Sequence, residues 1–581
     1  MYLPLLSASR RSRSSVTAFG GYDHTAACGE AEFYEEQNLS SRQYPALCPR
    51  LPRTRTATLS APHGLYAKNG LIWVDGTRLF YNGQDVGAVA DSDKVFCGIG
   101  SKVLIWPDKV YLDTADQTLH PLGARWEAAG NVSFSPARED GTAYTVKTTG
   151  PTPPEEPENG DYWLDTGGTG DVLRVYSSAS ESWNAVATTY LRIGAAGIGE
   201  NFARYDTVTV SGVSGGLLGE STAAALNTDL TVWDCGADYL TVTGLLDRTV
   251  LQTPEDGTIT VERRIPNLDY LTESDNRVWG CSSADHAIYA CRLGDPTNWF
   301  SYIGTAADSY TVSVGSDGPF TGAATCMGYV LLFKENLVHK IYGTKPANYQ
   351  VTTVACRGVR PGASASLALA GETLYYLSAD GVMQYDGSLP ACISAAFGPV
   401  RYVAGAAGAG PGECRFSLQD AAGGWHLFCY DTVRRIWHRE DDTHALAFAA
   451  AGQTLYWLSA DGGLWAAGTE QDPYAGSTGQ EPGVEWSGTT GAIGLYTADH
   501  KFVSRLELRL EAQAGASLRL EAQYEDAGGW ETLAAWTPAP RRSLLVPVVP
   551  RRSRWLRLRL SGSGEVVLYS LTRIIEQGSE L

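Results

Sequence analysis

Two similar segments, 81 residues apart, limit most strongly how this chain can fold. The first, GETLYYLSADGVMQY, spans residues 371–385, and the second, GQTLYWLSADGGLW, spans residues 452–465. Because the blades of a β-propeller repeat roughly every 40–50 residues, this separation fits two blades and predicts a similar unit between them. The segment GGWHLFCYDTVRRIWHRED, residues 423–441, meets that expectation. It has an apolar strand, a tight turn and a second strand rich in aromatic residues.

Four more units of the same kind precede these three. Each has a short apolar or alternating run bounded by Gly, Asp or Asn, as strands and turns require. They are NGLIWVDGTRLFYNG (69–83), GSKVLIWPDKVYLDT (100–114), NRVWGCSSADHAIYACRLG (276–294) and MGYVLLFKENLVHKIYG (327–343). The seven units predict an all-β protein with a β-propeller of about seven blades, at residues 56–126 and 245–481.

The series of units is interrupted in the middle of the chain. An acidic, Pro-rich linker, PTPPEEPENG at 151–160, leads into short strands with turn signals, and a second group of strands follows from residue 204. We expect two small β modules inserted into the propeller, at residues 127–192 and 193–244. The Ala-rich segment 221–226 comes nearest to a helical pattern, and it is short.

The pattern changes again after residue 481. Strict alternation appears in Arg-rich runs such as RLELRLEA, in which Leu506, Leu508 and Leu510 would face one way and the charges the other. This alternation predicts a C-terminal β-sandwich at residues 482–581. Residues 1–55 are expected to be an N-terminal arm and the segment that leads into the propeller.

Charge and cysteine usage exclude several classes of protein. The net charge is −19, which argues against a protein that grips nucleic acid through its phosphates. The eleven cysteines form no C-x-x-C and no ligand spacing with His, so we expect reduced, mostly buried thiols and no zinc site. The Asp-rich stretches 90–93 and 308–318 lack the EF-hand spacing for calcium. No cofactor is expected.

The N-terminal sequence does not indicate export or membrane insertion. In MYLPLLSASRRSRSS the charges follow the apolar run, which is the reverse of a signal peptide. No apolar run approaches the roughly 18 residues of a membrane span. We therefore expect neither export by a signal of its own nor insertion into a bilayer.

The chain is predicted not to be an enzyme. No phosphate-binding loop of the G-x-x-x-x-G-K-[ST] type occurs. SADGGLW at 459–465 is close to the Asp-box of sialidase-type propellers, but one residue short; Asp461 and Gly462 are expected only to form a hairpin turn. His438, beside a cluster of opposite charges, is expected on a solvated strand edge.

Two groups of side chains are candidates for binding. Four aromatic residues in the first inserted module could stack on sugar rings, or could instead form the core of a very small domain: Tyr162, Trp163, Tyr176 and Trp183. Arginines of the C-terminal region could contact an acidic partner, or could serve only solubility and the protection of strand edges: Arg541, Arg542, Arg551 and Arg552. The N-terminal run Arg10, Arg11 and Arg13 could be a disordered tail or an arm that docks on a neighbour.

Several segments, taken together, resemble a known family of proteins. They are residues 18–50 (AFGGYDH to CPR), LGDPTNWF (293–300), GSDGPFTG (315–322), LLFKEN (331–336), and RLELRL with QYEDAGGW in the terminal region. These phrases are similar to propeller-type virion proteins of tailed bacteriophages: the tail nozzle or tail-hub proteins of short-tailed phages, including those described as packaged-DNA stabilisation proteins.

The resemblance implies a structural virion component in the tail, made in the host bacterial cytoplasm. Its copies would form a homo-oligomeric ring of six subunits in the nozzle, hub or head-to-tail connector. The ring would contact portal and adaptor proteins and tail fibres or other tail proteins. DNA would pass through the lumen during ejection without specific binding, which an acidic wall favours.

Two other functions remain open from sequence. The chain could be a receptor-binding or carbohydrate-binding tail protein, with the aromatic module or the sandwich as the binding part. It could also be a glycan hydrolase built on a propeller, which needs two carboxylates about 5–9 Å apart in a central pocket.

Overall fold

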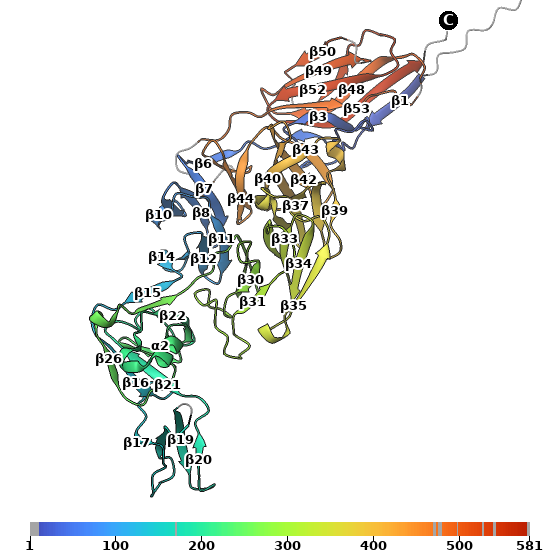
Figure 1. Cartoon of the computed structure of the whole chain (residues 1–581). Coiled ribbons are helices and arrows are strands. Elements are labelled where there is room, and N and C mark those ends of the chain that lie inside the picture. Colours follow the sequence, from blue (N-terminus) through green and yellow to red (C-terminus); the bar gives the residue numbers. More distant parts are fainter. Residues whose placement is uncertain are drawn as a thin grey trace, which may run out of the picture. The chain divides into compact units, whose positions relative to one another are not determined.

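The computed structural model describes residues 11–168, 171–468, 472–474, 479–496, 498–525, 528–537 and 542–577. Within these ranges the chain is nearly all β, with many small sheets, four single-turn 3-10 helices and two short α-helices, α1 (Gly215–Leu218) and α2 (Glu220–Leu226) (Figure 1). The second helix contains the Ala-rich segment. The chain divides into two compact units, one formed by residues 1–94, 318–340 and 351–581, and the other by residues 95–317 and 341–350.

Outside the inserted region, seven four-stranded sheets follow one pattern, in which strands consecutive in sequence are neighbours in the sheet, apart from one exchanged strand in the seventh. Sheet 1 contains β7 (Pro62–Ala67), β8 (Leu71–Asp75), β9 (Arg78–Tyr81) and β10 (Gln84–Ala88). Sheet 2 contains β11 (Val95–Ile99), β12 (Lys102–Trp106), β13 (Val110–Asp113) and β14 (Thr118–Pro121). Sheet 3 contains β28 (Tyr270–Ser274), β29 (Arg277–Ser282), β30 (Ala287–Ala290) and β31 (Tyr310–Ser313). Sheet 4 contains β32 (Gly322–Cys326), β33 (Tyr329–Lys334), β34 (Leu337–Tyr342) and β35 (Gln350–Ala355). Sheet 5 contains β36 (Ala368–Ala370), β37 (Thr373–Ser378), β38 (Gly381–Tyr385) and β39 (Ala391–Cys392).

Sheets 6 and 7 complete the series. Sheet 6 contains β40 (Tyr402–Gly410), β41 (Glu413–Asp420), β42 (Trp425–Asp431) and β43 (Ile436–Arg439). Sheet 7 contains β44 (Ala445–Ala451), β45 (Thr454–Ser459) and β46 (Gly463–Ala466), and its fourth strand is β6 (Thr54–Thr58) from the beginning of the series. Each of the seven strand–turn–strand units expected from the sequence lies in a different one of these sheets.

Successive sheets within one unit pack against each other. In the first unit, β36 lies against β40, β40 against β44, and β44 against β7. One hydrophobic cluster spans sheets 4, 5 and 6 and includes the buried rings of Phe333, Tyr376 and Phe416. A second joins sheets 7 and 1. In the second unit, a cluster joins sheets 2 and 3, with the rings of Trp106 and Trp299 6.0 Å apart.

The strands between sheets 2 and 3 form three further sheets. Two of them contain β15 (Ala124–Glu127), β27 (Thr260–Arg263), β22 (Thr207–Ser211) and β23 (Asp229–Thr231); and β24 (Asp234–Gly236), β25 (Tyr239–Thr243), β21 (Tyr190–Gly194), β16 (Val132–Ala137) and β26 (Val250–Gln252). The third contains β17 (Val146–Gly150), β18 (Tyr162–Asp165), β19 (Val172–Ser177) and β20 (Ser182–Ala185).

The core of this region does not divide at residues 192 and 193, where we expected one module to end and the next to begin. A single hydrophobic cluster contains Phe134, Ile193 and Val261, and therefore unites the first two sheets. The sheet of β17–β20 is inserted between β16 and β21 of that body. The difference arises because β16 and β21 pair with each other although 52 residues separate them, and local periodicity does not reveal such a pairing.

The C-terminal strands form two sheets around one core, which we name the C-terminal two-sheet region. One sheet has the order β1 (Arg11–Val16), β53 (Val566–Gln577), β48 (Lys501–Ala512) and β51 (Arg542–Val546). The other has the order β2 (Gly21–Tyr22), β3 (Glu32–Gln37), β47 (Glu485–Thr490), β52 (Leu556–Ser563), β49 (Ser517–Tyr524) and β50 (Glu531–Trp536). A short pair, β4 (Leu39–Ser40) and β5 (Cys48–Pro49), follows β3 in the chain.

The alternation expected in this region is confirmed, since Leu506, Leu508 and Leu510 are all buried in the shared core. The N-terminal segment differs from the expectation of a separate arm. Strands β1 and β3, blue in Figure 1, pair with β53 and β47 of the same chain. Unpaired edges of β53 and β47 would otherwise be exposed, and these N-terminal strands cover them.

Candidate functional site

The four aromatic residues proposed to stack on sugars lie in the small sheet β17–β20, but not all on one face. The pairing register places Trp163 opposite Arg174 and Tyr176 opposite Trp183, so these four side chains share a face. Tyr162 pairs with Val175 and faces the other way.

Packing within the sheet uses much of this aromatic surface. Trp163 is only 5% exposed, its ring lies 5.5 Å from that of Trp183, and its Nε1 donates a hydrogen bond to the Gly150 carbonyl. Tyr176 and Trp183 are half-buried, with ring centres 5.4 Å apart. On this face, therefore, only the rings of Tyr176 and Trp183 have surface that a ligand could reach.

The arginines proposed to contact a partner lie in or near the C-terminal two-sheet region. Arg11 and Arg13 are exposed on β1, and Arg11 lies 3.7 Å from Glu576. Arg542 is exposed at the start of β51, and Arg551 and Arg552 are exposed in the loop before β52. Arg551 pairs with Glu531 and lies over the ring of Tyr524. Arg10 and Arg541 lie outside the described residues.

The Asp-box-like turn forms the expected hairpin between β45 and β46. The Asp461 carboxylate accepts a hydrogen bond of 3.0 Å from the backbone N–H of Gly463. Gly462 has a φ of +85°, and a Cβ there would lie 2.1 Å from the Leu59 carbonyl oxygen. Both residues are therefore explained by the turn and by the close approach of the chain before β7.

A glycan hydrolase would need two carboxylates in one pocket, so the carboxylates in cavity walls are informative. Cavities of about 220, 470 and 430 Å³ are lined by described residues, in sheets 4 and 5, around β16 and β21, and in the C-terminal two-sheet region. In these three cavities Asp238 is the single carboxylate. None of the three has the pair that acid–base hydrolysis of a glycosidic bond requires.

Several buried and partly buried charges gather at a place that the sequence did not indicate. We name it the Glu440 cluster; its three arginines and three carboxylates are Arg50, Arg53, Arg415, Glu440, Asp441 and Glu481. They come from the segment after β5, from β41, from the end of β43, and from the chain before β47. The cluster therefore joins four separate segments of the chain.

Glu440 is the centre of the cluster, and it is only 2% exposed. Its carboxylate accepts hydrogen bonds of 2.6 Å from Arg53 and 3.1 Å from Arg415. Burial alone would raise the pKa of Glu440, but Arg415, Arg53 and Arg50 outweigh burial and hold this pKa at about 2. Glu440 is consequently ionised at any pH near neutrality.

The other ion pairs of the cluster surround this centre. Arg50 makes a two-pronged contact with Glu481, with N–O distances of 2.7 and 2.9 Å, and Arg53 donates to Asp441 at 2.6 Å. The guanidinium of Arg53 also lies 5.1 Å from the ring centre of Trp457. Arginines paired with carboxylates in this way hold together the chain segments that carry them.

His438 corrects the expectation of a solvated strand edge. It is 3% exposed, and its Nδ1 lies 2.6 Å from the Oε1 of Glu36, which is also 3% exposed. Burial raises the pKa of Glu36, and the adjacent imidazole opposes that rise. The expectation failed because the partner lies 402 residues away, on β3, and covers the edge of β43.

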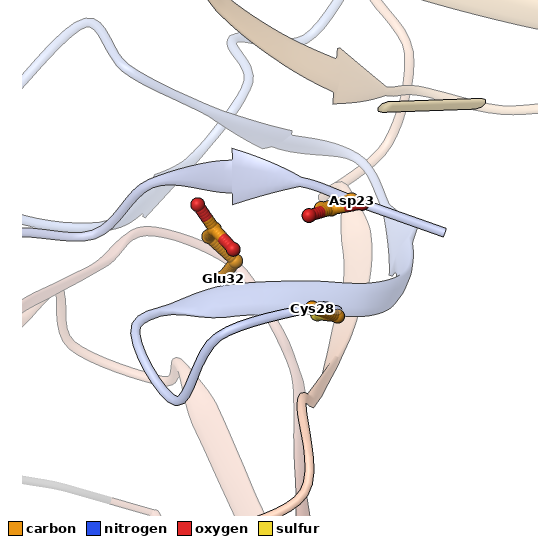
Figure 2. Close-up of side chains that lie close together, drawn as sticks. All are labelled: Asp23, Cys28 and Glu32. Carbon is orange, nitrogen blue, oxygen red and sulfur yellow. The ribbon is translucent and has the colours of Figure 1, made fainter. Parts of the chain in front are cut away.

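Asp23, Cys28 and Glu32 form one group whose atoms are of types that bind metals. Figure 2 shows the three side chains close together in the N-terminal segment, and their potential ligand atoms all lie within 4.8 Å of one another. Burial, together with the two nearby carboxylates, raises the pKa of the Cys28 thiol to about 12. The carboxylates of Asp23 and Glu32 already accept hydrogen bonds from the N–H groups of Thr25 and Gly29.

A divalent cation could bind this group only by displacing the thiol proton, since the thiolate is the ligand form of cysteine. No spacing rule for zinc identifies D-x₄-C-x₃-E, so the sequence alone did not indicate this group.

The eleven cysteines are all unpaired and seven are buried, which confirms the expectation of mostly buried thiols. In the described part of the chain, no helix has the length and apolar character to cross a membrane.

Comparison with known proteins adds little about this chain. No protein-family model matches the sequence, and no curated protein matches it significantly. Similar solved structures include BamB from Moraxella catarrhalis, with 11% identity and a TM-score of 0.30 over 73% of this chain and 98% of that one. The computationally designed Ika8 protein has 10% identity and a TM-score of 0.28, over 71% and 99% of the two chains. An exo-β-1,3-galactanase from Phanerochaete chrysosporium has 8% identity and a TM-score of 0.21, over 52% and 95%. Scores this low establish neither the fold nor the function of this chain.

Proposed function

We propose that this chain is a structural protein of the tail of a tailed bacteriophage, whose copies form a ring through which DNA passes. The observation that carries the proposal is the series of seven four-stranded sheets, of which the last is completed by β6 from the start of the series. We propose that these sheets are the blades of a β-propeller. A strand exchanged between the two ends of such a series joins them and leaves few free edges.

The resemblance in sequence supplies the place of this scaffold in the virion. It favours a tail nozzle, tail hub or head-to-tail connector, a ring of six subunits, and portal, adaptor and tail proteins as neighbours. The net charge of −19 supports a channel that repels DNA rather than binding it.

The experiment is the assembly state of the purified chain and its presence in particles. Light scattering and negative-stain electron microscopy of the purified chain are expected to show a ring of six subunits, and mass spectrometry is expected to find the chain in tails of the phage that encodes it. A strictly monomeric chain that is missing from purified virions would exclude the proposal.

Carbohydrate binding is the second candidate, and the shared face of Tyr176, Trp183 and Arg174 favours it. Aromatic rings with accessible faces can stack on pyranose rings, and Arg174 supplies hydrogen-bond donors beside them. A glycan array separates the two functions. Binding that disappears in Trp183→Ala but persists in Trp425→Ala, a partly exposed tryptophan of sheet 6, would identify this face as a lectin site. No binding to any host surface glycan would count against it.

A further inference from the structure

A cavity of about 220 Å³ lies between sheets 4 and 5, in the first compact unit, and we name it the Lys340 cavity. Strands β33, β34 and β35 provide one wall. The end of β38 and the loop that follows it provide the other. The loop residues are Gly387, Ser388, Leu389 and Pro390.

The walls are apolar except at one point. Leu331, Phe333 and Val338 are buried around the cavity and have no polar side-chain atoms. The single charged group in the lining is the ammonium of Lys340, with the hydroxyl of Tyr385 beside it. An apolar cavity with one or two convergent polar groups is the usual composition of a small-molecule site.

The ammonium of Lys340 has hydrogen-bond donors available for an anion. Its Nζ lies 3.5 Å from the centre of the Tyr329 ring and 3.5 Å from the Tyr385 hydroxyl oxygen, a long hydrogen bond. Among the described residues, this ammonium makes no ion pair with a carboxylate. An ammonium has three donors and needs acceptors when it is partly removed from water. The two neutral neighbours leave that need largely unmet.

The loop that lines one side of the cavity has a well-defined turn. Asp386 accepts hydrogen bonds from the hydroxyl and the backbone N–H of Ser388, which fixes the turn before Leu389. Gly387 has a φ of +102°, a conformation that favours glycine. Leu389 is 66% exposed at this turn, so it does not fill the space beneath it. The cavity is therefore preformed rather than dependent on a rearrangement of the sheets.

We propose that the Lys340 cavity binds a small organic anion that has one aromatic ring and one carboxylate. The ring would lie among Leu331, Phe333 and Val338, and the carboxylate would accept hydrogen bonds from Lys340 and Tyr385. An apolar cavity of about 150 Å³ is known to hold benzene, so about 220 Å³ has room for a ring with a short acidic arm. The ammonium decides the charge of the ligand, since a neutral ligand would leave it without an ionic partner.

Cys356 provides a direct test, because its thiol lines the cavity whereas Cys392 is exposed and is not in the lining. Purified full-length chain is alkylated with iodoacetamide, with and without phenylacetate, and the rate at each cysteine is followed by peptide mass spectrometry. We expect phenylacetate to slow alkylation of Cys356 and to leave Cys392 unchanged. Toluene, which has the ring without the carboxylate, is expected to protect only weakly.

The variant Lys340→Met keeps the apolar stem and removes the charge. It is expected to weaken phenylacetate binding about tenfold or more, the effect of losing one charge-assisted hydrogen bond. The matched control is Lys102→Met, because Lys102 also lies over a tyrosine ring, 4.9 Å from the centre of Tyr111, but is not in the lining. Failure of millimolar phenylacetate to protect Cys356 in the unmodified chain would overturn the proposal. Equal protection by toluene and phenylacetate, unaffected by Lys340→Met, would overturn the assignment of an anion.

Discussion

Replacement of Glu440 by Gln is expected to destabilise the first compact unit strongly. The substitution keeps the size of the side chain and removes the charge that faces Arg53 and Arg415 at 2.6 and 3.1 Å. Glu440 is 2% exposed, so water cannot replace the lost partner. Both guanidinium groups would remain in the core with one counter-charge fewer, which is the costly half of breaking a buried ion pair.

Two independent routes give the size of the effect. Removal of one member of a buried ion pair costs about 3–5 kcal/mol in proteins generally. The pKa of Glu440 is lowered from its ordinary 4.5 to about 2, and at 1.36 kcal/mol per pKa unit this corresponds to roughly 3–4 kcal/mol. We therefore expect a loss of about 3–4 kcal/mol in the free energy of unfolding at neutral pH.

Urea unfolding followed by tryptophan fluorescence measures this loss, because Trp457 lies under both Arg53 and Arg415. The denaturant slope should stay unchanged while the midpoint falls. The control is Glu139→Gln, since Glu139 pairs with Arg204 at 3.0 Å with both side chains about half exposed, and such pairs contribute only about 0–1 kcal/mol. An equal, small loss in the two variants would refute the reasoning.

The same carboxylate predicts a pH dependence in the unmodified chain. Because the pKa of Glu440 is lower in the folded state than in the unfolded chain, its stabilisation is complete above about pH 4.5. It is lost as the pH falls from about 4.5 towards 2. Glu440→Gln should remove this part of the acid sensitivity and leave the remainder.

Three further predictions concern other parts of the chain. Burial raises the pKa of Cys28 to about 12, so at pH 8 iodoacetamide should modify exposed Cys392 in the native chain and leave Cys28 intact until urea unfolds it; rapid native labelling of Cys28 would contradict this. Burial, with Lys334 nearby, lowers the pKa of His339 to about 4. The free energy of unfolding should therefore fall as the pH drops from about 6.5 to 4, and His339→Gln should flatten that decrease. A pH profile that is the same in the variant and the unmodified chain would count against this prediction. Removal of residues 1–16 takes away β1 and exposes the edge of β53, so light scattering should detect self-association that removal of residues 1–10 alone does not cause.

Local pattern in the sequence was sufficient to find the units of this fold. Each expected strand–turn–strand unit lies in its own four-stranded sheet, because a hairpin depends on residues close in sequence and on turn residues such as Gly462. Alternation likewise identified the inward leucines of β48. Periodicity of two marks which face of a strand is buried, whatever its neighbours are.

Pairings over long sequence distances could not be predicted in this way. β1 pairs with β53, and β3 pairs with β47, although hundreds of residues separate them. The segment RRIWHRED is rich in charged residues, as is typical of an exposed strand edge. His438 and Glu440 are nevertheless buried, because β3 and the segment after β5 cover them. Whether a charge is solvated depends on those distant segments, and the one signal available was the density of opposite charges around a tryptophan.

The Glu440 cluster also explains how the N-terminal segment finds one sheet among seven that are similar. Apolar strand edges in a repeated architecture offer several nearly equivalent surfaces, and hydrophobic contact does not distinguish among them. A buried arginine is tolerated only where its carboxylates are already in place, since an unmatched position leaves the charge without a partner. Arg50 and Arg53 meet their partners at the end of β43 and at Glu481, and the backbone N–H of Asn38 bonds to the carbonyls of Arg439 and Glu440. Matched carboxylates at this one place therefore favour docking here, even where apolar residues of the same volume would hold the segment as firmly.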